Sequence, residues 1–329
     1  MKPFSLLVKP VGAACNLACD YCFYLDRARL YPNGPAVMPD AVLDRMLESY
    51  LALPFDSHTI TFQGGEPLLA GIDFYRRVAE KARRFTRGDA KVNIAVQTNA
   101  TLMTPEMAHL MAEENWLCGV SADGPAAIHD IHRRTPSGEP TYDAVVRGIA
   151  MLRDAGCEYN ILALVTKDNV GDPAGVYRHL RDNLGGAWQQ YTDHRESITP
   201  QEWDDFLCGV MDTWVADDDI GRVSVRNIDS VMAYVESGIA GQCILADRCD
   251  GYFVIERNGD VYPCDFSVSE RTLLGNVMKD DWDSLCRNPM RLSFAVTKCP
   301  RHLSRIPSMR FCDLVMKSVL TLHVKKRII

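Results

Sequence analysis

Hydrophobic and polar positions alternate along the first two thirds of the chain in a regular succession of strand-like and helix-like segments. Short apolar runs rich in β-prone residues predict strands at 4–10, 58–67, 91–100, 117–125, 158–166 and 187–193. Between them, apolar residues recur at the spacing of an amphipathic helix at 40–53, 72–86, 104–116, 142–156 and 173–186. This alternation indicates parallel strands joined by right-handed crossovers.

Six such units are too few for a closed eight-unit barrel, so we expect an α/β fold with a partial (β/α)6 barrel over residues 1–235. Asp40 is a plausible helix N-cap, Thr104 with Pro105 a second one, and Gly156 a helix end. In barrels of this kind, functional groups gather on the loops that follow the carboxyl ends of the strands. The cysteine-rich loop and the sequences GGEP, QTN and SADGP all occupy such positions.

Residues 236–329 have weak helix and strand signals, which predicts a small, irregular, cysteine-rich C-terminal domain. One stretch is clearer, because GYFVIERNGDVYPCDF is typical of a β-hairpin with Asn258 and Gly259 at its turn.

Composition narrows the possible partners and surroundings. The formal net charge of −7 argues weakly against nucleic acid as the main partner. No run approaches the roughly 18 apolar residues that span a bilayer, and the N-terminus lacks a signal-peptide pattern, so we expect a cytoplasmic protein without a membrane partner. In a chain of 329 residues without such a signal, twelve cysteines indicate metal binding or catalysis rather than disulfides.

Cys15, Cys19 and Cys22 form a C-x3-C-x2-C pattern directly after the first predicted strand. Three thiolates can hold three irons of a [4Fe–4S] cluster and leave the fourth iron open, whereas a closed site needs a fourth cysteine. A zinc site with a distant fourth ligand, or an accidental grouping of cysteines, are the alternatives.

This loop, with an aromatic residue before its last cysteine, resembles the radical S-adenosylmethionine (SAM) superfamily. The resemblance implies that SAM chelates the open iron and that cluster reduction releases a 5′-deoxyadenosyl radical. The sequence FQGGEP, with Gly64, Gly65 and Glu66, resembles the site for the SAM amino group, because glycines permit close backbone approach and a carboxylate accepts from an amino group. By itself, such a motif is also compatible with an ordinary turn at the end of a strand.

Consecutive blocks over roughly residues 5–190 and 220–275, among them FQGGEPLLAGIDFY and GVSADGPAAIHDIHRR, look like those of the anaerobic sulfatase-maturating enzymes. This resemblance implies SAM contacts from Tyr21, Gly65, Ser121 and Arg133. Without it, Ser121 is compatible with turn chemistry and Arg133 with a solvated surface charge.

His129 and His132 have the helical spacing of a metal-chelating pair. The resemblance instead assigns them to a loop after DGP and gives them no ligand role. Ala100 occupies the place after QTN where the family has a glycine.

The resemblance makes Asp265 the proton acceptor for the substrate, which a carboxylate within hydrogen-bond reach can be. Hydrogen abstraction from the β-carbon of a Cys or Ser side chain, followed by loss of a proton and an electron, gives a thioaldehyde or an aldehyde. The alternative for Asp265 is a turn residue beside a structural cysteine.

The C-terminal region resembles the SPASM extension, which holds two auxiliary [4Fe–4S] clusters in this family. Two closed clusters need eight thiolates, but only six cysteines follow residue 240, and Cys286 lies in a helix-like stretch that favours a core thiol. We therefore expect one auxiliary cluster, or two with the second incomplete after about residue 295. The predicted ligands are Cys243, Cys249, Cys264, Cys299 and Cys312.

The tail from Pro300 onward carries seven Lys and Arg residues and a single acid, Asp313, in place of the family's downstream cysteine run. One hypothesis is a divergent or frame-shifted terminus that cannot complete both clusters.

Taken with the resemblance, the sequence predicts a radical SAM oxidoreductase that converts a Cys or Ser of an unfolded sulfatase segment to Cα-formylglycine. A flavodoxin or ferredoxin is the expected reductant. Another SPASM-type peptide maturase, for example one that forms thioethers, and an inactive iron–sulfur or zinc protein are the rival interpretations.

Overall fold

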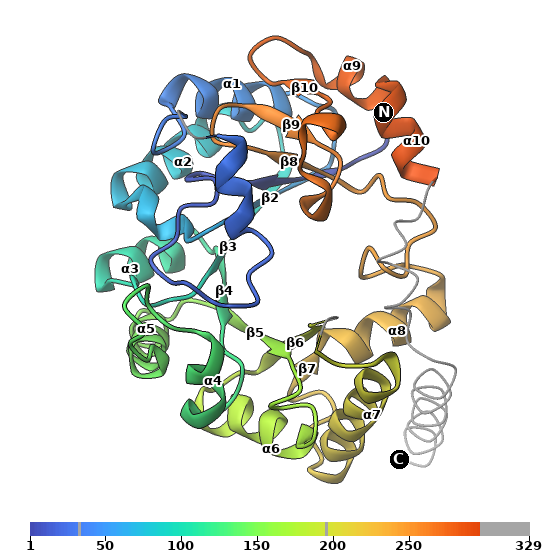
Figure 1. Ribbon diagram of the computed structural model, residues 1–329. Coiled ribbons are helices and arrows are strands. Elements are labelled where there is room, and N and C mark those ends of the chain that lie inside the picture. The colour runs from blue at the N-terminus through green and yellow to red at the C-terminus, as the bar shows by residue number, and fades with distance from the viewer. Residues whose placement is uncertain (32–33, 195–196, 297–329) are drawn as a thin grey trace. The chain divides into compact units, whose positions relative to one another are not determined.

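The computed structural model describes residues 1–31, 34–194 and 197–296, and these divide into two compact units (Figure 1). The first unit contains Met1–Val120, His132–Tyr159 and the stretch that begins at Arg248. The second contains Ser121–Ile131 and Asn160–Asp247. The predicted boundary between residues 235 and 236 stays a prediction.

The first unit has a mainly parallel sheet with strand order β10-β9-β8-β1-β2-β3-β4. Strands β1, β2, β3 and β4 run parallel, β8 joins β1 in parallel, and β8, β9 and β10 pair antiparallel. The strands are β1 (Ser5–Val8), β2 (Ser57–Phe62), β3 (Lys91–Thr98), β4 (Leu117–Ser121), β8 (Tyr252–Ile255), β9 (Asp260–Tyr262) and β10 (Gly275–Asn276).

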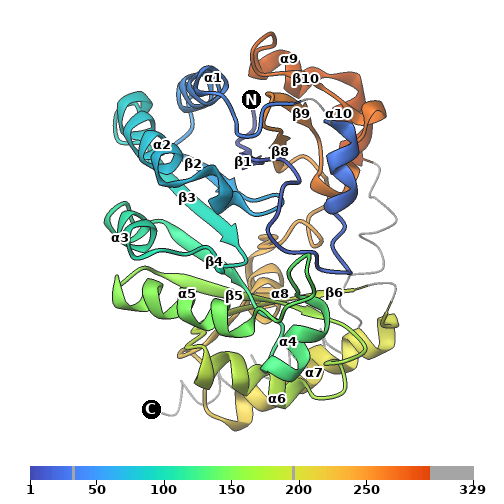
Figure 2. The ribbon, with the colours of Figure 1, turned by 60° about the vertical axis from the view of Figure 1, so that its left-hand side comes forward.

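Helices cover one face of this sheet, as Figure 2 shows for α1, α2, α3 and α5. The helices are α1 (Asp40–Leu51), α2 (Ile72–Phe85), α3 (Pro105–Glu113), α5 (Tyr142–Asp154), α9 (Trp282–Arg287) and α10 (Pro289–Val296), with short helices η1 (Leu25–Leu30), η2 (Pro67–Ala70), η4 (Asp265–Ser267) and η5 (Glu270–Thr272). Burial alternates along β1 and β2, because successive side chains point to opposite faces and only one face is fully covered.

The C-terminal part of the first unit is attached to the first strand through aromatic packing. The ring of Phe4 lies 4.8 Å from that of Phe253 and 5.4 Å from that of Trp282, measured between centroids. The indole of Trp282 also donates to Ser49 Oγ at 2.9 Å. Residues far apart in sequence therefore share one hydrophobic core with β1.

The second unit contains three parallel strands in the order β5-β6-β7 and the helices that follow them. Its elements are α4 (Ala126–His132), β5 (Tyr159–Val165), α6 (Pro173–Arg178), the π-helical turn η3 (His179–Asn183), β6 (Trp188–Asp193), α7 (Pro200–Ala216), β7 (Ser224–Val225) and α8 (Arg226–Ser237).

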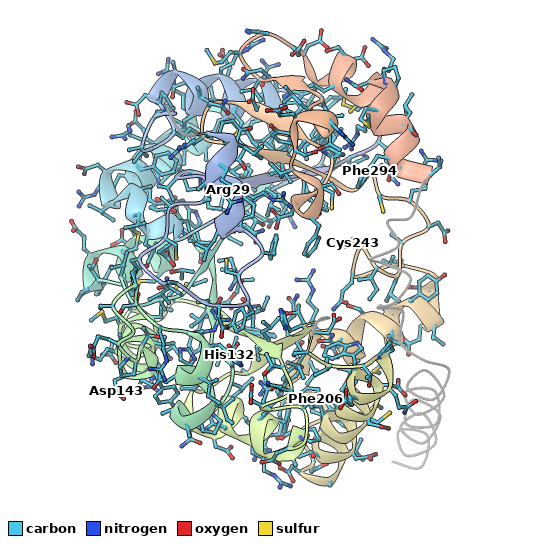
Figure 3. The ribbon with its side chains drawn as sticks, viewed as in Figure 1. Arg29, His132, Asp143, Phe206, Cys243 and Phe294 are labelled. Carbon is cyan, nitrogen blue, oxygen red and sulfur yellow. The ribbon has the colours of Figure 1, made fainter. Side chains whose placement is uncertain are left out.

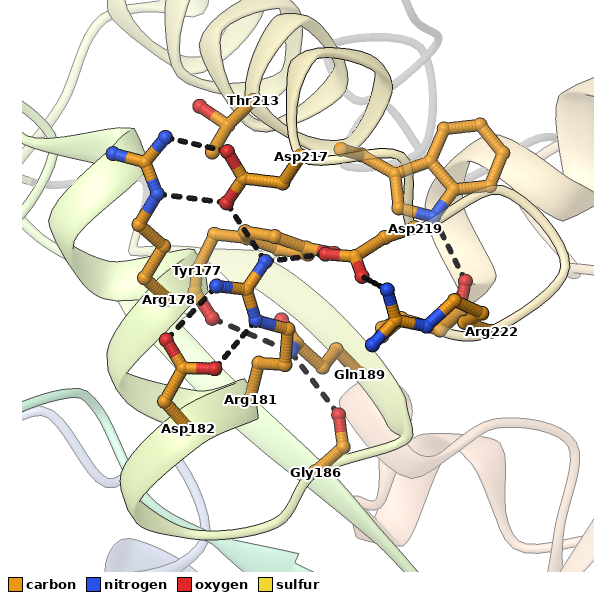
Figure 4. A network of polar contacts seen from close by, with 12 residues as sticks. Tyr177, Arg178, Arg181, Asp182, Gly186, Gln189, Thr213, Asp217, Asp219 and Arg222 are labelled. Carbon is orange, nitrogen blue, oxygen red and sulfur yellow. Dashed lines mark hydrogen bonds and ion pairs between the residues drawn. The ribbon is translucent and has the colours of Figure 1, made fainter.

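A network of ion pairs connects α6 and η3 to the residues after α7 (Figure 4). Arg178 forms a two-point contact with Asp217, at 2.7 and 2.8 Å. Arg181 contacts Asp217 at 2.7 Å and also pairs with Asp219, which is almost fully buried. The hydroxyl of Tyr177 donates to Asp219 at 2.7 Å, so this buried carboxylate is well satisfied.

The predicted succession of strands and helices over the first two thirds of the chain is confirmed, with several local differences. Pro39 is the N-cap of α1 and Asp40 its first residue, so the predicted cap was one residue too late. The segment after DGP is the helix α4, not a loop, and His132 lies at its end (Figure 3). Helices α7 and α8 were not predicted. A capping box at Thr199 and Glu202 starts α7, and this local signal could have revealed it.

Other local predictions are confirmed. Thr104 accepts a hydrogen bond from the backbone N–H of Met107 and caps α3. Gly156 has a left-handed φ of +69° just past α5, and β8 and β9 form the hairpin predicted around Gly259. None of the helices in the described ranges is both long and apolar enough to cross a membrane.

Candidate active site

The cysteine loop follows the carboxyl end of β1, and its three thiols are partly exposed. The backbone N–H of Leu17 donates to Cys15 Sγ at 3.3 Å, and the amide of Asn99 approaches the same sulfur at 3.9 Å. Burial raises the pKa of the Cys15 thiol, and the negative charges of Glu66 and Cys22 add to this effect. A cationic iron centre would remove that repulsion and hold the thiolate form.

Three thiols on one loop are the donor set of a [4Fe–4S] cluster that keeps one iron open. Within the described ranges, no set of three or more Cys, His, Asp and Glu side chains converges closely enough to hold one ion. The assignment of Cys15, Cys19 and Cys22 as the cluster's ligands stays a prediction, and the donors at Cys15 are of the kind that tune sulfur ligands.

The GGEP motif is joined to the cysteine loop through the backbone. The N–H of Gly65 donates to Gly12 O and that of Glu66 donates to Ala14 O, both at 2.8 Å. A Cβ on Gly65 would lie 2.0 Å from Ala14 O, which is too close for any other residue. Gly64 has a φ of +146°, which also favours glycine. Both glycines are thus needed for this close approach.

Glu66 is fully buried at the end of this motif. Its Oε1 accepts from Leu68 N at 2.9 Å and from Thr98 Oγ1 at 2.7 Å, while Oε2 accepts from Asn99 N at 2.7 Å. Burial raises the pKa of Glu66 to about 7, although these three hydrogen bonds oppose the rise. The carboxylate thus holds its own turn together, and its contact with the SAM amino group stays a prediction.

Arg133 is nearly buried, so the interpretation as a solvated surface charge is wrong. Its guanidinium carbon lies 5.5 Å from the centre of the Tyr21 ring. The neighbouring His132 contacts the same loop, with Nδ1 2.9 Å from a carboxylate oxygen of Asp20. A backbone hydrogen bond joins the same two segments, because Ala18 N donates to Arg134 O at 2.8 Å.

Ser121 and Asp123 lie in the second unit, at the end of β4. Asp123 Oδ1 accepts from Leu164 N at 2.9 Å, and its carbonyl accepts from the amide of Asn169 at 3.1 Å. These bonds give Asp123 a structural role within that unit. The SAM contact of Ser121 stays a prediction.

Asp265 is the first residue of η4, next to the buried Cys264. The hydroxyl of Tyr252 donates to Cys264 Sγ at 3.3 Å. Gln63 donates to Asp265 Oδ2 at 2.8 Å, and Lys9 Nζ lies 2.6 Å from Oδ1. Both contacts join residues that are distant in sequence. The position of the charged Lys9 directly after the first strand is the one local signal in the sequence that indicates a role for it near this site.

The predicted auxiliary ligands are divided between the units. Cys249 and Cys264 belong to the first and Cys243 to the second, while Cys299 and Cys312 lie outside the described residues, as does the tail. Cys286 is half-buried in α9, where burial raises the pKa of its thiol. That setting agrees with the prediction of a core thiol.

The chain is similar in sequence to known protein families. The radical SAM superfamily model matches residues 10–180, and an iron–sulfur cluster-binding domain called SPASM matches residues 243–313. The serine-type anaerobic sulfatase-maturating enzyme of Bacteroides thetaiotaomicron is 32% identical, over 90% of this chain and 78% of its own length. The cysteine-type enzyme of Clostridium perfringens is 33% identical, over 84% and 78%.

The fold is also similar to that of solved structures. A structure of anSMEcpe with bound AdoMet and a Cp18Cys peptide has a TM-score of 0.84 at 30% identity, covering 94% of this chain and 88% of that one. Streptococcus suis SuiB bound to its precursor peptide SuiA has a TM-score of 0.65 at 16% identity, covering 92% and 69%, which is a likeness of fold alone.

The two family matches imply [4Fe–4S] clusters and SAM as cofactors, in agreement with the thiols at the end of β1. The mixed α/β fold is that of the radical SAM enzymes, and the chain is a radical SAM oxidoreductase. It belongs to the radical SAM superfamily and, within it, to the anaerobic sulfatase-maturating enzymes.

Proposed function

We propose that this protein oxidises a Cys or Ser side chain in an unfolded sulfatase segment to Cα-formylglycine. The main observation in support is that the first unit joins the cysteine loop, the GGEP turn and the carboxylate of Asp265 in one network. The homologues carry names of both the serine and the cysteine type, and related structures contain peptides.

Residues that follow β1 and β2 form most of the proposed cofactor site. Cys15, Cys19 and Cys22 hold the cluster, and Glu66 accepts from the SAM amino group. Gly64, Gly65, Tyr21 and Ser121 line SAM, and Arg133 pairs with its carboxylate, since a guanidinium suits a carboxylate partner. When bound, the reduced cluster and SAM would supply the radical for hydrogen abstraction from the substrate β-carbon, and auxiliary clusters would provide an acceptor for the electron.

Asp265 performs the acid–base part of the reaction. Its carboxylate takes the proton from the substrate thiol or hydroxyl as the carbon–heteroatom double bond forms. A serine then gives the aldehyde directly, whereas a cysteine gives a thioaldehyde that water converts to the aldehyde with release of hydrogen sulfide. The structure supports this role because Asp265 is nearly buried and held at both oxygens.

Cys243, Cys249 and Cys264 are the proposed auxiliary ligands within the described residues, joined by Cys299 and Cys312 beyond them. Flavodoxin or ferredoxin is the proposed electron donor. Iron and sulfide counts on anaerobically reconstituted protein test the auxiliary sites. Roughly four to eight irons per chain would support an incomplete second cluster, and about twelve would exclude it.

The decisive experiment incubates the reduced, reconstituted enzyme with SAM and matched sulfatase peptides that carry Cys or Ser at the target position. Mass spectrometry should show an aldehyde, which reacts with a hydrazine probe. A thioether would instead show only the loss of two hydrogens, and deoxyadenosine without any change in peptide mass would refute this substrate.

Two cysteine variants connect the activity to the loop. Cys15→Ala should abolish SAM cleavage because one of three cluster ligands is lost. Cys157→Ala removes a buried thiol of the same unit, after the end of α5, and should retain SAM cleavage. Absence of SAM cleavage by the reduced wild-type protein would favour an inactive iron–sulfur protein.

A further inference from the structure

Lys9 is a buried ammonium group beside the proposed proton acceptor. It follows β1 directly and is 1% exposed. Its Nζ lies 2.6 Å from Asp265 Oδ1 and 4.3 Å from the centre of the Tyr24 ring, an arrangement that combines an ion pair with a cation–π contact. A lysine in such surroundings needs charged partners, because an unpaired buried ammonium is costly.

The register of three neighbouring strands explains why these groups meet. Val8 of β1 pairs with Phe62 of β2 on one side and with Ile255 of β8 on the other. The next residue on each strand is therefore Lys9 in the middle, with Gln63 and Glu256 beside it. Because parallel neighbours in register point to the same face, a cation is placed between an amide and a carboxylate.

Asp265 is held at both of its oxygens by this row. Gln63 Nε2 donates to Oδ2 at 2.8 Å, and the ammonium of Lys9 lies 2.6 Å from Oδ1 as an ion pair without hydrogen-bond geometry, so Oδ1 has no hydrogen-bond partner among the described residues. Two contacts on opposite oxygens restrict rotation of the carboxylate and set the direction of its remaining lone pairs. Such fixed orientation is what a base needs at the moment of proton transfer.

Tyr24 lies between Lys9 and Glu256 in this cluster, with its ring next to the ammonium and its hydroxyl on the carboxylate. Glu256 is 1% exposed, its Oε1 accepts from the hydroxyl of Tyr24, and its Oε2 has no hydrogen-bond partner among the described residues. Burial raises the pKa of Glu256 and the charge of Lys9 opposes that rise, so the two groups interact electrostatically, while the Tyr24 ring lies under the ammonium.

Gly64 gives the Lys9 side chain its space. A Cβ at Gly64 would lie 3.2 Å from Lys9 Cδ and 2.6 Å from Gly12 O. The turn that leads to the proposed SAM site therefore also fixes the course of the lysine stem. A shift of the turn at Gly64 would therefore displace the Lys9 side chain.

Stability alone gives little reason for this arrangement, because a buried ion pair can often be replaced by apolar residues without loss. We propose that Lys9 is a positioning residue, packed on the Tyr24 ring, that orients the carboxylate of Asp265 toward the substrate thiol or hydroxyl. This inference rests on the proposed function, since it assumes that Asp265 accepts the substrate proton.

The test uses Lys9→Met, which keeps the apolar stem and removes the charge, in the reconstituted full-length enzyme. The substrate is a sulfatase-derived Cys peptide deuterated at the β-carbon. Deuterium in deoxyadenosine reports hydrogen abstraction, and aldehyde formation reports completion. Because abstraction precedes proton transfer, Lys9→Met should keep deuterium transfer and peptide affinity within about threefold of wild type. Formylglycine per deoxyadenosine should fall about tenfold or more, within the range that acid–base groups contribute.

Two further variants separate orientation from folding. Lys81→Met removes another ion pair of the same unit, with Nζ 2.9 Å from Asp44, and should behave as wild type. Lys9→Met leaves the buried carboxylates of Asp265 and Glu256 without a nearby lysine. Adding Glu256→Gln removes one of these two carboxylates. The double variant should fold and show the same loss of aldehyde per deoxyadenosine.

The outcomes distinguish the two levels of the hypothesis. Wild-type protein that yields no aldehyde would overturn the proposed function and this inference with it. Wild-type protein that yields aldehyde, beside a folded Lys9 variant with an unchanged ratio of aldehyde to deoxyadenosine, would overturn the role of Lys9 alone. Loss of deuterium transfer in parallel with aldehyde would also overturn it, because it would indicate general damage to the site.

Discussion

Glu66 should make the stability of the cofactor-free protein depend on pH, and Glu66→Gln should remove that dependence. Burial raises the pKa of this carboxyl group to about 7, whereas its ordinary value is 4.5. A carboxyl group whose pKa is higher in the folded chain binds its proton more tightly there. Its contribution to stability is therefore complete below about pH 4.5 and is lost as the pH rises through about 7.

The size of the effect follows from the two values. One pKa unit corresponds to about 1.36 kcal/mol, so the wild-type protein should lose roughly 2–3 kcal/mol relative to Glu66→Gln between pH 5 and pH 8. The variant also alters the hydrogen bonds from Leu68, Thr98 and Asn99, which shifts its stability by an amount that does not depend on pH. The test therefore depends on how the difference in unfolding free energy between wild type and Glu66→Gln changes with pH, not on the absolute size of that difference.

Urea titrations followed by tryptophan fluorescence at pH 5, 6, 7 and 8 would measure this difference, since the chain contains five tryptophans. Glu48→Gln, at an exposed position of α1, is the matched control and should follow the wild type at every pH. Parallel curves for the wild type and Glu66→Gln would refute the reasoning. They would mean that the three hydrogen bonds outweigh burial and keep the carboxylate ionised.

Three more substitutions test the backbone and the ion pairs. Gly65→Ala should abolish SAM binding, measured by equilibrium dialysis, because its Cβ would collide with Ala14 O; retained affinity would contradict the proposed site. Ala100→Gly should raise the free energy of unfolding by about 0.5–1 kcal/mol, since Ala100 has a left-handed φ of +59°, and a loss of stability in thermal unfolding would contradict this. Asp219→Asn should cost roughly 1–3 kcal/mol, because Arg181 loses a buried partner, and an unchanged urea midpoint would show the pair to be dispensable.

Local patterns in the sequence were sufficient for the features that depend on neighbouring residues. The spacing of Cys15, Cys19 and Cys22, the glycines of the GGEP turn and the order of strands and helices are all short-range signals. The conformational reason is direct at Gly65, where only the absence of a side chain permits contact with the cysteine loop. Helix α4 was misassigned because a resemblance was given more weight than its own helical spacing.

Contacts between distant segments were decided by the tertiary structure alone. Gln63 and Asp265 are 202 positions apart, and nothing in either neighbourhood indicates that they meet. Lys9 and Glu256 follow neighbouring strands at the same level only because β1 and β8 pair in parallel with Val8 opposite Ile255. A slip of one residue would turn these side chains to opposite faces of the sheet, since side chains alternate along a strand. The sequence by itself thus determined which chemical groups are present and on which loops, whereas strand register decided which of them touch.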